Sequence, residues 1–426
     1  MIPQAQLQQS LPSLTPTPNI ISRPYTTGSS NVPELSSFYA LGDSYSAGIG
    51  ANCSWITDDF DPTGSCLKCK GAYPYQIVDI SNSTSSSPSS TNLPPYTNGE
   101  EQTQVYHLGC TGASIPDILT VGWDNRTSQL QLMEEAIERG DIGTWGTLSV
   151  GGNDVGFANV VADCVMLNTA GCEASLNATE AMVRDPNLVA QLVETYLSVL
   201  EIAPVEDFKL IVTSYARFFN AETEECDTHF FIRGHYLTRP FRRRLNAMIE
   251  SLNLLIQVAV AIVQMQLVFG GSGMSVFFED WDAVFEGRRF CEEAEGKHWE
   301  RDAWFFTVAG DDILRDGSKA AVNDVKPPPG QDGAVVDFEK LARECAMEGW
   351  KEEDWTERLL CNWARTLEDE RKARGTRGEG EDGGEFEELS KTVYPWYVKK
   401  AMHPKTIAHA ELGRSLFEKW VSGEYA

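Results

Sequence analysis

Basic residues are scarce in this chain of 426 residues. Lysine and arginine together number 35, against 62 aspartates and glutamates, which gives a formal net charge of −27 at pH 7. Nucleic acids and anionic membrane surfaces would repel such a chain, because both carry negative charge. The composition therefore argues against both as partners and favours solubility.

The N-terminus has no features of a secretory leader. Residues 1–20 contain neither a basic residue nor a long apolar run. Other features nevertheless favour export. The ten cysteines form an even set that is typical of disulfide-bonded secreted proteins, and four triplets match the N-glycosylation pattern, at Asn52, Asn82, Asn125 and Asn177. We therefore expect an extracellular glycoprotein whose signal peptide is missing from the sequence as given.

Histidine is also scarce, with six residues in the chain. Cys66 and Cys69 have the spacing of half a zinc site, but no second cysteine pair matches them. The sequence therefore predicts no metal site.

The longest apolar stretch, 252–269, follows a basic segment and is interrupted by four amide side chains. A buried amphipathic helix explains this pattern better than a membrane span, so we expect no integral membrane segment.

Composition divides the chain into four parts. Residues 1–35 are rich in Pro, Ser, Thr and Gln, which predicts a flexible lead-in, and 81–102 are expected to form a surface loop. Residues 36–325 would form the main part of one domain, and 391–426 its C-terminal part. Between them, 326–390 is an acidic insertion. It is either a helical hairpin stapled by its two cysteines or a partly disordered loop.

Short apolar segments alternate with segments of helical length over most of the main part. The expected strands are 37–42, 104–108, 146–150, 208–214 and 274–279. The expected helices are 72–80, 128–139, 188–203, 236–267 and 404–421. This alternation predicts an α/β fold in three layers, α/β/α, around a five-stranded parallel sheet. Ligands of such sheets bind at the C-terminal ends of the strands.

Four short stretches could carry chemistry, and three of them fall at or near expected strand ends. They are Gly42-Asp43-Ser44, the run 109–114 that includes Gly112, Ser149 to Phe157 with its Gly-Gly-Asn-Asp core, and 401–409 with His403 before a proline. Each also has an ordinary structural interpretation, as a helix cap or a turn. A nucleophilic serine, however, needs a base and oxyanion donors, and the four stretches together contain such residues.

In this order, the stretches resemble the motif blocks of the SGNH hydrolase superfamily, also called GDSL esterases and lipases. The likeness extends over 36–310 and 394–421 and is greatest to its secreted bacterial and fungal esterase branch; Arg-Phe-Cys-Glu at 289–292 adds to it. The resemblance implies a flavodoxin-like sheet and a nucleophile, Ser44. The oxyanion hole would consist of the Ser44 and Gly112 N–H groups and the Asn153 side chain. His403 would be the general base.

One position departs from the family pattern. Most members carry an aspartate three residues before the catalytic histidine, where this chain has Lys400. Some members of the branch use a backbone carbonyl instead, so we expect a Ser–His dyad in which the Lys400 carbonyl orients His403. The alternative is a carboxylate from elsewhere, such as Asp280 or Asp282.

The cysteines can be interpreted in the same light. Cys164 would pair with Cys172, Cys226 with Cys291, and Cys345 with Cys361 in the insertion. Cys53 would pair with either Cys66 or Cys69, and Cys110 with the remaining member of that set. Sequence alone does not decide between these pairings.

The resemblance implies a monomeric serine esterase or lipase that hydrolyses small-molecule, lipid or polysaccharide esters without a cofactor. A polysaccharide deacetylase and a non-catalytic carbohydrate- or lipid-binding relative are the alternatives. An α/β-hydrolase serine enzyme requires Gly-x-Ser-x-Gly, which the chain does not contain.

Overall fold

A computed structural model of the chain describes residues 37–86, 103–122, 126–166, 171–227, 237–293, 302–307, 310–321 and 399–425, with residues 341, 343, 345 and 361. The expected lead-in 1–35 lies outside the described residues, as do most of the loop at 81–102 and most of the insertion 326–390. The predicted division into these parts stays a prediction.

A five-stranded parallel sheet forms the centre of the fold, as predicted. Its strand order is β2-β1-β3-β4-β5, and every neighbouring pair is parallel. The strands are β1 (Phe38–Gly42), β2 (Val105–His107), β3 (Trp145–Ser149), β4 (Lys209–Thr213) and β5 (Ser275–Glu279). All five fall on segments that the sequence predicted to be strands.

Burial on both faces explains why the central strands are continuous apolar runs. Every residue of β1 and β3 is buried, as expected for a parallel strand covered by helices on both sides. Phe38 of β1 pairs with Trp145 of β3, and their rings stack at 4.2 Å between centroids. The tight packing of β1 holds its C-terminal end, and therefore Ser44, in a fixed place.

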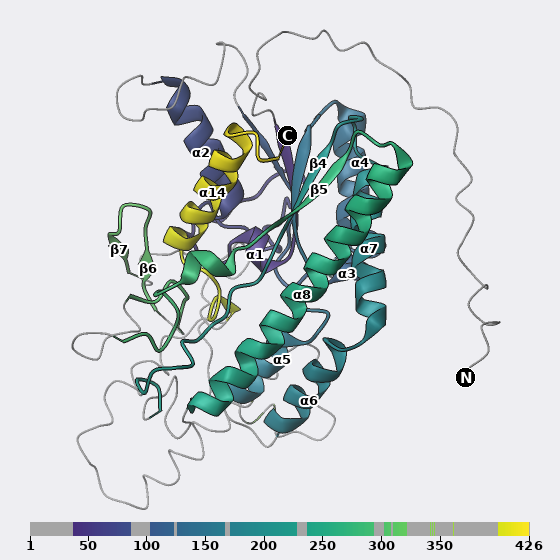
Figure 1. Cartoon of the computed structure of the whole chain (residues 1–426). Coiled ribbons are helices and arrows are strands. Elements are labelled where there is room, and N and C mark those ends of the chain that lie inside the picture. Colours follow the sequence, from purple (N-terminus) through teal and green to yellow (C-terminus); the bar gives the residue numbers. More distant parts are fainter. Residues whose placement is uncertain are drawn as a thin grey trace, which may run out of the picture.

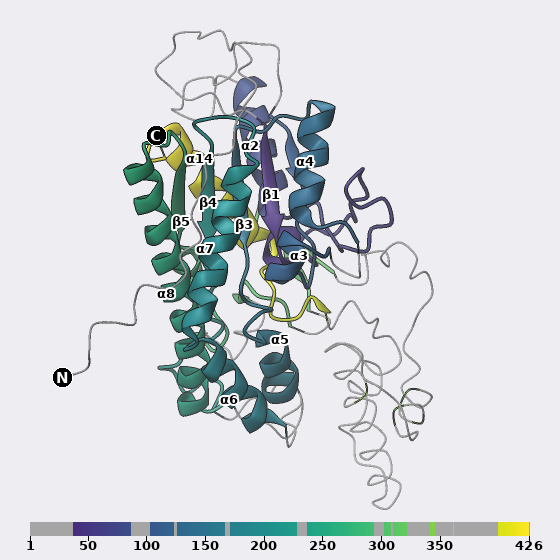
Figure 2. The ribbon, with the colours of Figure 1, turned by 90° about the vertical axis from the view of Figure 1, so that its right-hand side faces the viewer.

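Helices cover both faces of the sheet (Figures 1 and 2). Helices α2 (Tyr73–Ser86) and α14 (Thr406–Val421) lie together on one face. Helices α4 (Gln129–Arg139), α7 (Pro186–Glu201) and α8 (Arg239–Gly270) lie on the other. This arrangement confirms the three-layer α/β/α fold.

Shorter elements follow the strand ends or extend the fold at its margins. They are α1 (Ser44–Ala47), α3 (Ile115–Leu119), α5 (Phe157–Val160), the π-helix η2 (Val161–Met166), α6 (Cys172–Met182), the 3-10 helix η3 (Asp282–Phe285), and a two-stranded antiparallel pair, β6 (Asp312–Ile313) and β7 (Lys319–Ala320). Helices α1, α3 and α5 follow β1, β2 and β3, so their first residues meet at the C-terminal edge of the sheet.

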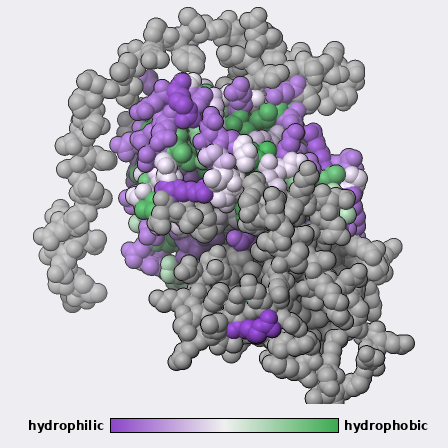
Figure 3. Space-filling view, turned by 180° about the vertical axis from the view of Figure 1, so that it is seen from behind, coloured by the Kyte–Doolittle hydropathy of each residue, from purple (hydrophilic) through white to green (hydrophobic). Residues whose placement is uncertain are grey.

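Helix α8 contains the long apolar stretch. Its inner face is buried, and two of the amides that interrupt the apolar pattern bond to backbone: Asn253 bonds to Tyr215, and the Gln264 side chain accepts the Val276 N–H at 2.8 Å. Among the described residues, α8 alone is long and apolar enough to cross a membrane by length and composition. Its outer face exposes apolar side chains, including Phe269. Elsewhere, in the view from behind, the described surface is mostly hydrophilic (Figure 3).

The ten cysteines form five disulfides. The three pairs that were predicted without an alternative, 164–172, 226–291 and 345–361, are confirmed. Cys53 bonds to Cys69, which leaves Cys66 for Cys110. Cys66 and Cys69 therefore belong to different disulfides, and neither offers the thiolate that a zinc site needs.

Candidate active site

Ser44 lies at the C-terminal end of β1, as the first residue of α1. The residue that caps this helix is Asp43, whose carboxylate accepts the Tyr45 N–H at 3.0 Å. Asp43 thus takes the capping role that the sequence had left open for Ser44. The Ser44 hydroxyl is consequently available to another partner, and the residue lines a cavity.

The imidazole of His403 lies beside Ser44, although the two residues are 359 positions apart in the chain. Its Nε2 atom is 2.7 Å from the Ser44 Oγ, and its Nδ1 atom is 3.1 Å from the carbonyl oxygen of Ala401. A carbonyl oxygen can only accept a hydrogen bond, so the ring proton belongs on Nδ1. Nε2 then accepts a hydrogen bond from the Ser44 hydroxyl. A neutral imidazole with its proton on Nδ1 is the tautomer that a general base requires.

The carbonyl that Nδ1 contacts is that of Ala401, one residue after Lys400, whose carbonyl the sequence predicted for this contact. The Lys400 carbonyl instead accepts the backbone N–H of His403 at 3.0 Å. Met402, between Ala401 and His403, has a left-handed φ of 66°. This conformation is uncommon for a residue with a side chain, and it turns the chain so that the imidazole folds back onto Ala401.

The Lys400 side chain takes no part in orienting the imidazole. It is buried, its ammonium donates to the Gly310 carbonyl at 2.7 Å, and it lies 4.4 Å from the centre of the Phe306 ring. Burial lowers the pKa of this ammonium to about 7. Lysine at this position therefore supports the loop that carries His403.

The two alternative carboxylates lie in other contacts. Asp280 accepts from the Ser214 hydroxyl at 3.2 Å, and Asp282 forms an ion pair with Arg217 at 2.8 Å. Within the described part of the chain, neither Asp280 nor Asp282 hydrogen-bonds to His403. The geometry therefore favours a dyad over a triad that includes either residue.

A neighbouring segment that the sequence did not single out holds the His403 loop. Phe306 accepts the Met402 N–H at 2.8 Å and donates its own N–H to the His403 carbonyl at 2.9 Å. Two backbone hydrogen bonds thus fix the residues on which the imidazole depends. Burial lowers the pKa of His403 to about 4, although the Ala401 and Lys400 carbonyls oppose this shift. The ring is therefore neutral near pH 7.

Gly112 lies in the turn after β2 and has a φ of 92°, which a glycine adopts at little cost. The preceding residue, Thr111, donates its N–H to the Cys66 carbonyl at 3.0 Å, and the Cys66–Cys110 disulfide holds the same turn. No described residue accepts the N–H of Gly112 or that of Ser44. Both residues line the same cavity.

Asn153 completes the set of possible oxyanion donors. It lies in the turn after β3, and its side-chain amide donates to the Ala113 carbonyl at 2.8 Å. An amide nitrogen has two N–H donors, so this bond fixes the orientation of the side chain and leaves one donor for a ligand. Ala113 directly follows Gly112, so the same contact ties the two predicted donors together.

The Cys66–Cys110 disulfide closes a loop of 44 residues, which predicts a large contribution to stability. We expect Cys66→Ser/Cys110→Ser to lower the free energy of unfolding by about 4 kcal/mol. The matched control, Cys164→Ser/Cys172→Ser, opens a loop of only 8 residues and should cost about 2.5 kcal/mol. Urea denaturation measures both values. A smaller loss for the first pair than for the second would contradict this account.

A cavity brings these residues together. Ser44, Gly112, Asn153 and His403 all lie on its wall. Residues of α5, η2, α8 and the segment after β4 contribute an apolar part of its lining, called its apolar side below: Phe157, Ala158, Val161, Phe218 and Ile249. The rest of the wall includes Ser65, Thr111 and Lys399.

Two curated proteins are similar to this chain. Lipase 1 of Streptomyces coelicolor (strain ATCC BAA-471 / A3(2) / M145) is 28% identical over 186 residues, and a lipase of Streptomyces rimosus is 25% identical over 187 residues. Each match covers 44% of this chain and 54% of the relative, so the chain spans about half the length of each. No family model matches the chain.

Among solved structures, the extracellular lipase from Streptomyces rimosus shares 22% identity with a TM-score of 0.43, over 64% of this chain and 88% of that one. The motif blocks, the sequence similarity to the two curated lipases and the parallel sheet that carries the blocks together support a place for this chain in the SGNH hydrolase superfamily.

Proposed function

We propose that the chain is a serine esterase or lipase that hydrolyses carboxylic esters through an acyl-enzyme on Ser44. The observation that carries this proposal is the 2.7 Å contact between the His403 Nε2 and the Ser44 Oγ. The ring proton is placed on Nδ1 by the Ala401 carbonyl, so the imidazole faces the hydroxyl as an acceptor. The five disulfides support a role outside the cell.

In the first step, the Ser44 oxygen attacks the ester carbonyl carbon while His403 takes the hydroxyl proton. The carbonyl oxygen becomes an oxyanion, and we assign its stabilisation to the N–H groups of Ser44 and Gly112 and to the Asn153 amide. When the tetrahedral intermediate collapses, His403 gives the proton to the leaving alcohol. A water molecule, activated by the same imidazole, then releases the acid and restores Ser44.

The acyl chain would lie along the apolar side of the cavity. Phe157, Ala158, Val161, Phe218 and Ile249 form that side. Each methylene group that moves from water into such a surface gains about 0.8 kcal/mol. A preference for esters of medium or long acyl chains over acetates follows from this geometry.

Ala158→Trp tests this preference, because the indole would fill the apolar side of the cavity. We expect kcat/KM for p-nitrophenyl octanoate to fall by about tenfold or more, while kcat/KM for p-nitrophenyl acetate changes by about twofold or less. Ala247→Trp is the matched control, since Ala247 lies exposed on α8 and does not line the cavity. Equal losses on both esters would contradict the placement of the acyl chain. A wild-type protein that hydrolyses neither ester would contradict the proposed function.

The acid limb of the pH profile should report His403. The base must be neutral, and burial lowers its pKa to about 4, so the rate should persist on acidification and be lost only near that value. Asp43 titrates earlier, because burial raises its pKa to about 6, but it transfers no proton in the reaction, so we expect at most a partial step there. The measurement is kcat/KM against pH in wild type. A complete loss of activity with a midpoint at about 6.5, the ordinary value for histidine, would contradict this assignment.

A further inference from the structure

The side chain of Tyr215 connects the turn of the nucleophile to the loop of Asn153. Tyr215 follows β4 and is buried against the cavity wall. Its hydroxyl donates to the Asp43 carboxylate at 2.5 Å and accepts the Gly152 N–H at 3.1 Å. One hydroxyl therefore joins the residue before Ser44 to the residue before Asn153.

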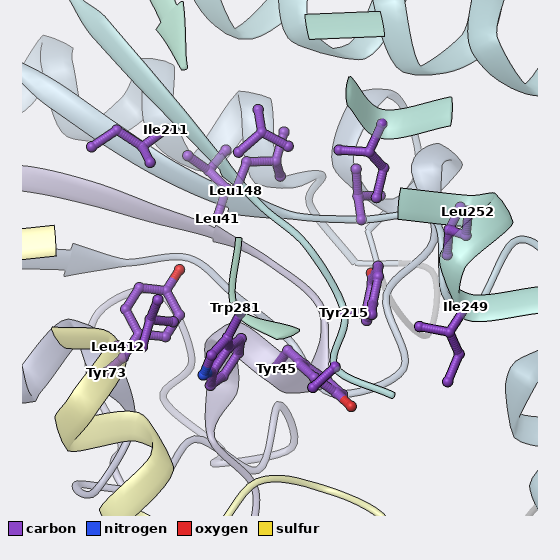
Figure 4. Packing of buried hydrophobic residues seen from close by; sticks show 14 of the residues in the cluster. Leu41, Tyr45, Tyr73, Leu148, Ile211, Tyr215, Ile249, Leu252, Trp281 and Leu412 are labelled. Atoms are coloured by element: carbon purple, nitrogen blue, oxygen red, sulfur yellow. The ribbon is translucent and has the colours of Figure 1, made fainter. Parts of the chain in front are cut away.

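The backbone of Tyr215 is itself held from the opposite side. The Asn253 amide of α8 accepts the Tyr215 N–H at 2.9 Å and donates to the Tyr215 carbonyl at 2.7 Å. In Figure 4, the Tyr215 ring lies between Tyr45 and Ile249, beside α8. The ring has little freedom to move, so the position of its hydroxyl is determined by the fold.

Gly152 is suited to this contact because it has no side chain. A Cβ atom added there would lie 3.0 Å from the Cε1 atom of the Tyr215 ring, which is closer than ordinary contact. The absence of a side chain lets the Gly152 N–H reach the tyrosine hydroxyl. The loop that carries Asn153 therefore packs closely against the Tyr215 ring.

Asp43 receives three donors, which keep its carboxylate in one place. Besides Tyr215, the Ser149 hydroxyl donates at 2.8 Å and the Tyr45 N–H at 3.0 Å. Burial, and to a smaller extent the charge of Asp154, raises the pKa of Asp43 and so opposes its ionisation. If the Tyr215 hydroxyl is removed, Asp43 loses a donor and the buried Gly152 N–H loses its acceptor.

We propose that Tyr215 is a positioning residue that sets the place of the Asn153 amide relative to Ser44. This inference rests on the proposed function, in which Asn153 stabilises the oxyanion. The Tyr215 hydroxyl bonds to Asp43 on one side of the site and to Gly152 on the other. Loss of this hydroxyl would therefore move the Asn153 amide away from the developing charge. The substrate would still find the same cavity, because the phenyl ring stays.

Tyr215→Phe tests the proposal on p-nitrophenyl octanoate. We expect kcat to fall by about 10- to 100-fold and KM to change by about twofold or less, because a small misplacement of a catalytic group acts mainly on the transition state. Tyr196→Phe is the matched control: Tyr196 is fully buried, and its hydroxyl has no partner among the described residues. Its kcat should match that of wild type.

A double-mutant cycle separates positioning from a general structural effect. Asn153→Ala should lower kcat by about 100-fold or more in wild type, but by about tenfold or less in the Tyr215→Phe background, where the amide is already displaced. Equal losses in the two backgrounds would overturn the inference, and so would a Tyr215→Phe variant with the kcat of wild type. In either case the proposed function would stand as long as wild type hydrolyses the ester.

If Tyr215→Phe does not fold, as judged by circular dichroism, Gly152→Ala takes its place. The added Cβ would push the loop away from the Tyr215 ring. We therefore expect Asn153→Ala to lower kcat by about tenfold or less in this background as well. An undiminished cost in that background would overturn the inference. A wild-type protein that does not hydrolyse the ester would instead contradict the proposed function itself.

Discussion

Ser44→Ala is expected to lower kcat for p-nitrophenyl octanoate by about 10⁶-fold, because it removes the atom that forms the acyl-enzyme. KM should change little, since the rest of the cavity wall is retained. The variant should also stay folded: Asp43, and not Ser44, caps α1, and alanine is a good helix former. Steady-state kinetics and a urea denaturation curve check the two expectations.

Ser251→Ala is a suitable control for the loss of a serine hydroxyl. Ser251 lies on α8 and does not line the cavity, and the Ala247 carbonyl within the helix is the one partner of its hydroxyl among the described residues. Its kcat should equal that of wild type. If Ser44→Ala kept the wild-type rate, another group would have to be the nucleophile, and the assignment would be wrong.

His403→Ala should cost as much as Ser44→Ala, again about 10⁶-fold in kcat, because a nucleophile and its base act as a unit. The double variant Ser44→Ala/His403→Ala should therefore be no slower than either single variant. This non-additivity distinguishes a dyad from two residues that contribute separately. The measurement is kcat for all three variants on the same ester.

His409→Asn is the control for the loss of an imidazole. His409 is buried, and its Nδ1 accepts the Tyr73 N–H at 3.3 Å, a bond that the asparagine oxygen can replace. It does not line the cavity. We expect a wild-type kcat for this variant. A His403→Ala variant that kept most of its activity would rule out His403 as the general base.

The sequence was sufficient to predict the sheet, because a strand that is buried on both faces is a continuous run of apolar residues. Strands β1 and β3 are buried at every residue, so they appear as short apolar runs that end in glycine or small polar residues. Parallel strands bring their C-terminal ends to one edge, and this rule explains why the Ser44, Gly112 and Asn153 stretches lie together. The likeness to a known family depended on the order of the four motif blocks, because no single block was specific enough to show it.

The orienting carbonyl could not be predicted in the same way. Whether the imidazole contacts the carbonyl of Lys400 or of Ala401 depends on the backbone of Met402. No feature of the sequence predicts the left-handed φ of that residue. The contacts of Phe306 with the His403 loop were equally hidden, because they are made by backbone groups that any residue carries.

Tyr215 and Asn253 were missed for a related reason. An aromatic residue after a buried strand is usually part of the core, and an amide in an apolar helix interrupts the pattern without showing its partner. Only the fold shows that the Asn253 amide bonds to both backbone groups of Tyr215, and that the Tyr215 hydroxyl reaches Asp43. Hydrogen bonds between distant segments leave no periodic signal.

Covalent labelling with an organophosphonate ester, followed by mass spectrometry of the peptides, tests whether Ser44 is a nucleophile activated by His403. We expect a phosphonyl adduct on the peptide that contains Ser44 in wild type, and no adduct in Ser44→Ala. Labelling in His403→Ala should be much slower, because the hydroxyl has lost its base. An unlabelled wild-type protein, or equal labelling of wild type and Ser44→Ala, would contradict the account.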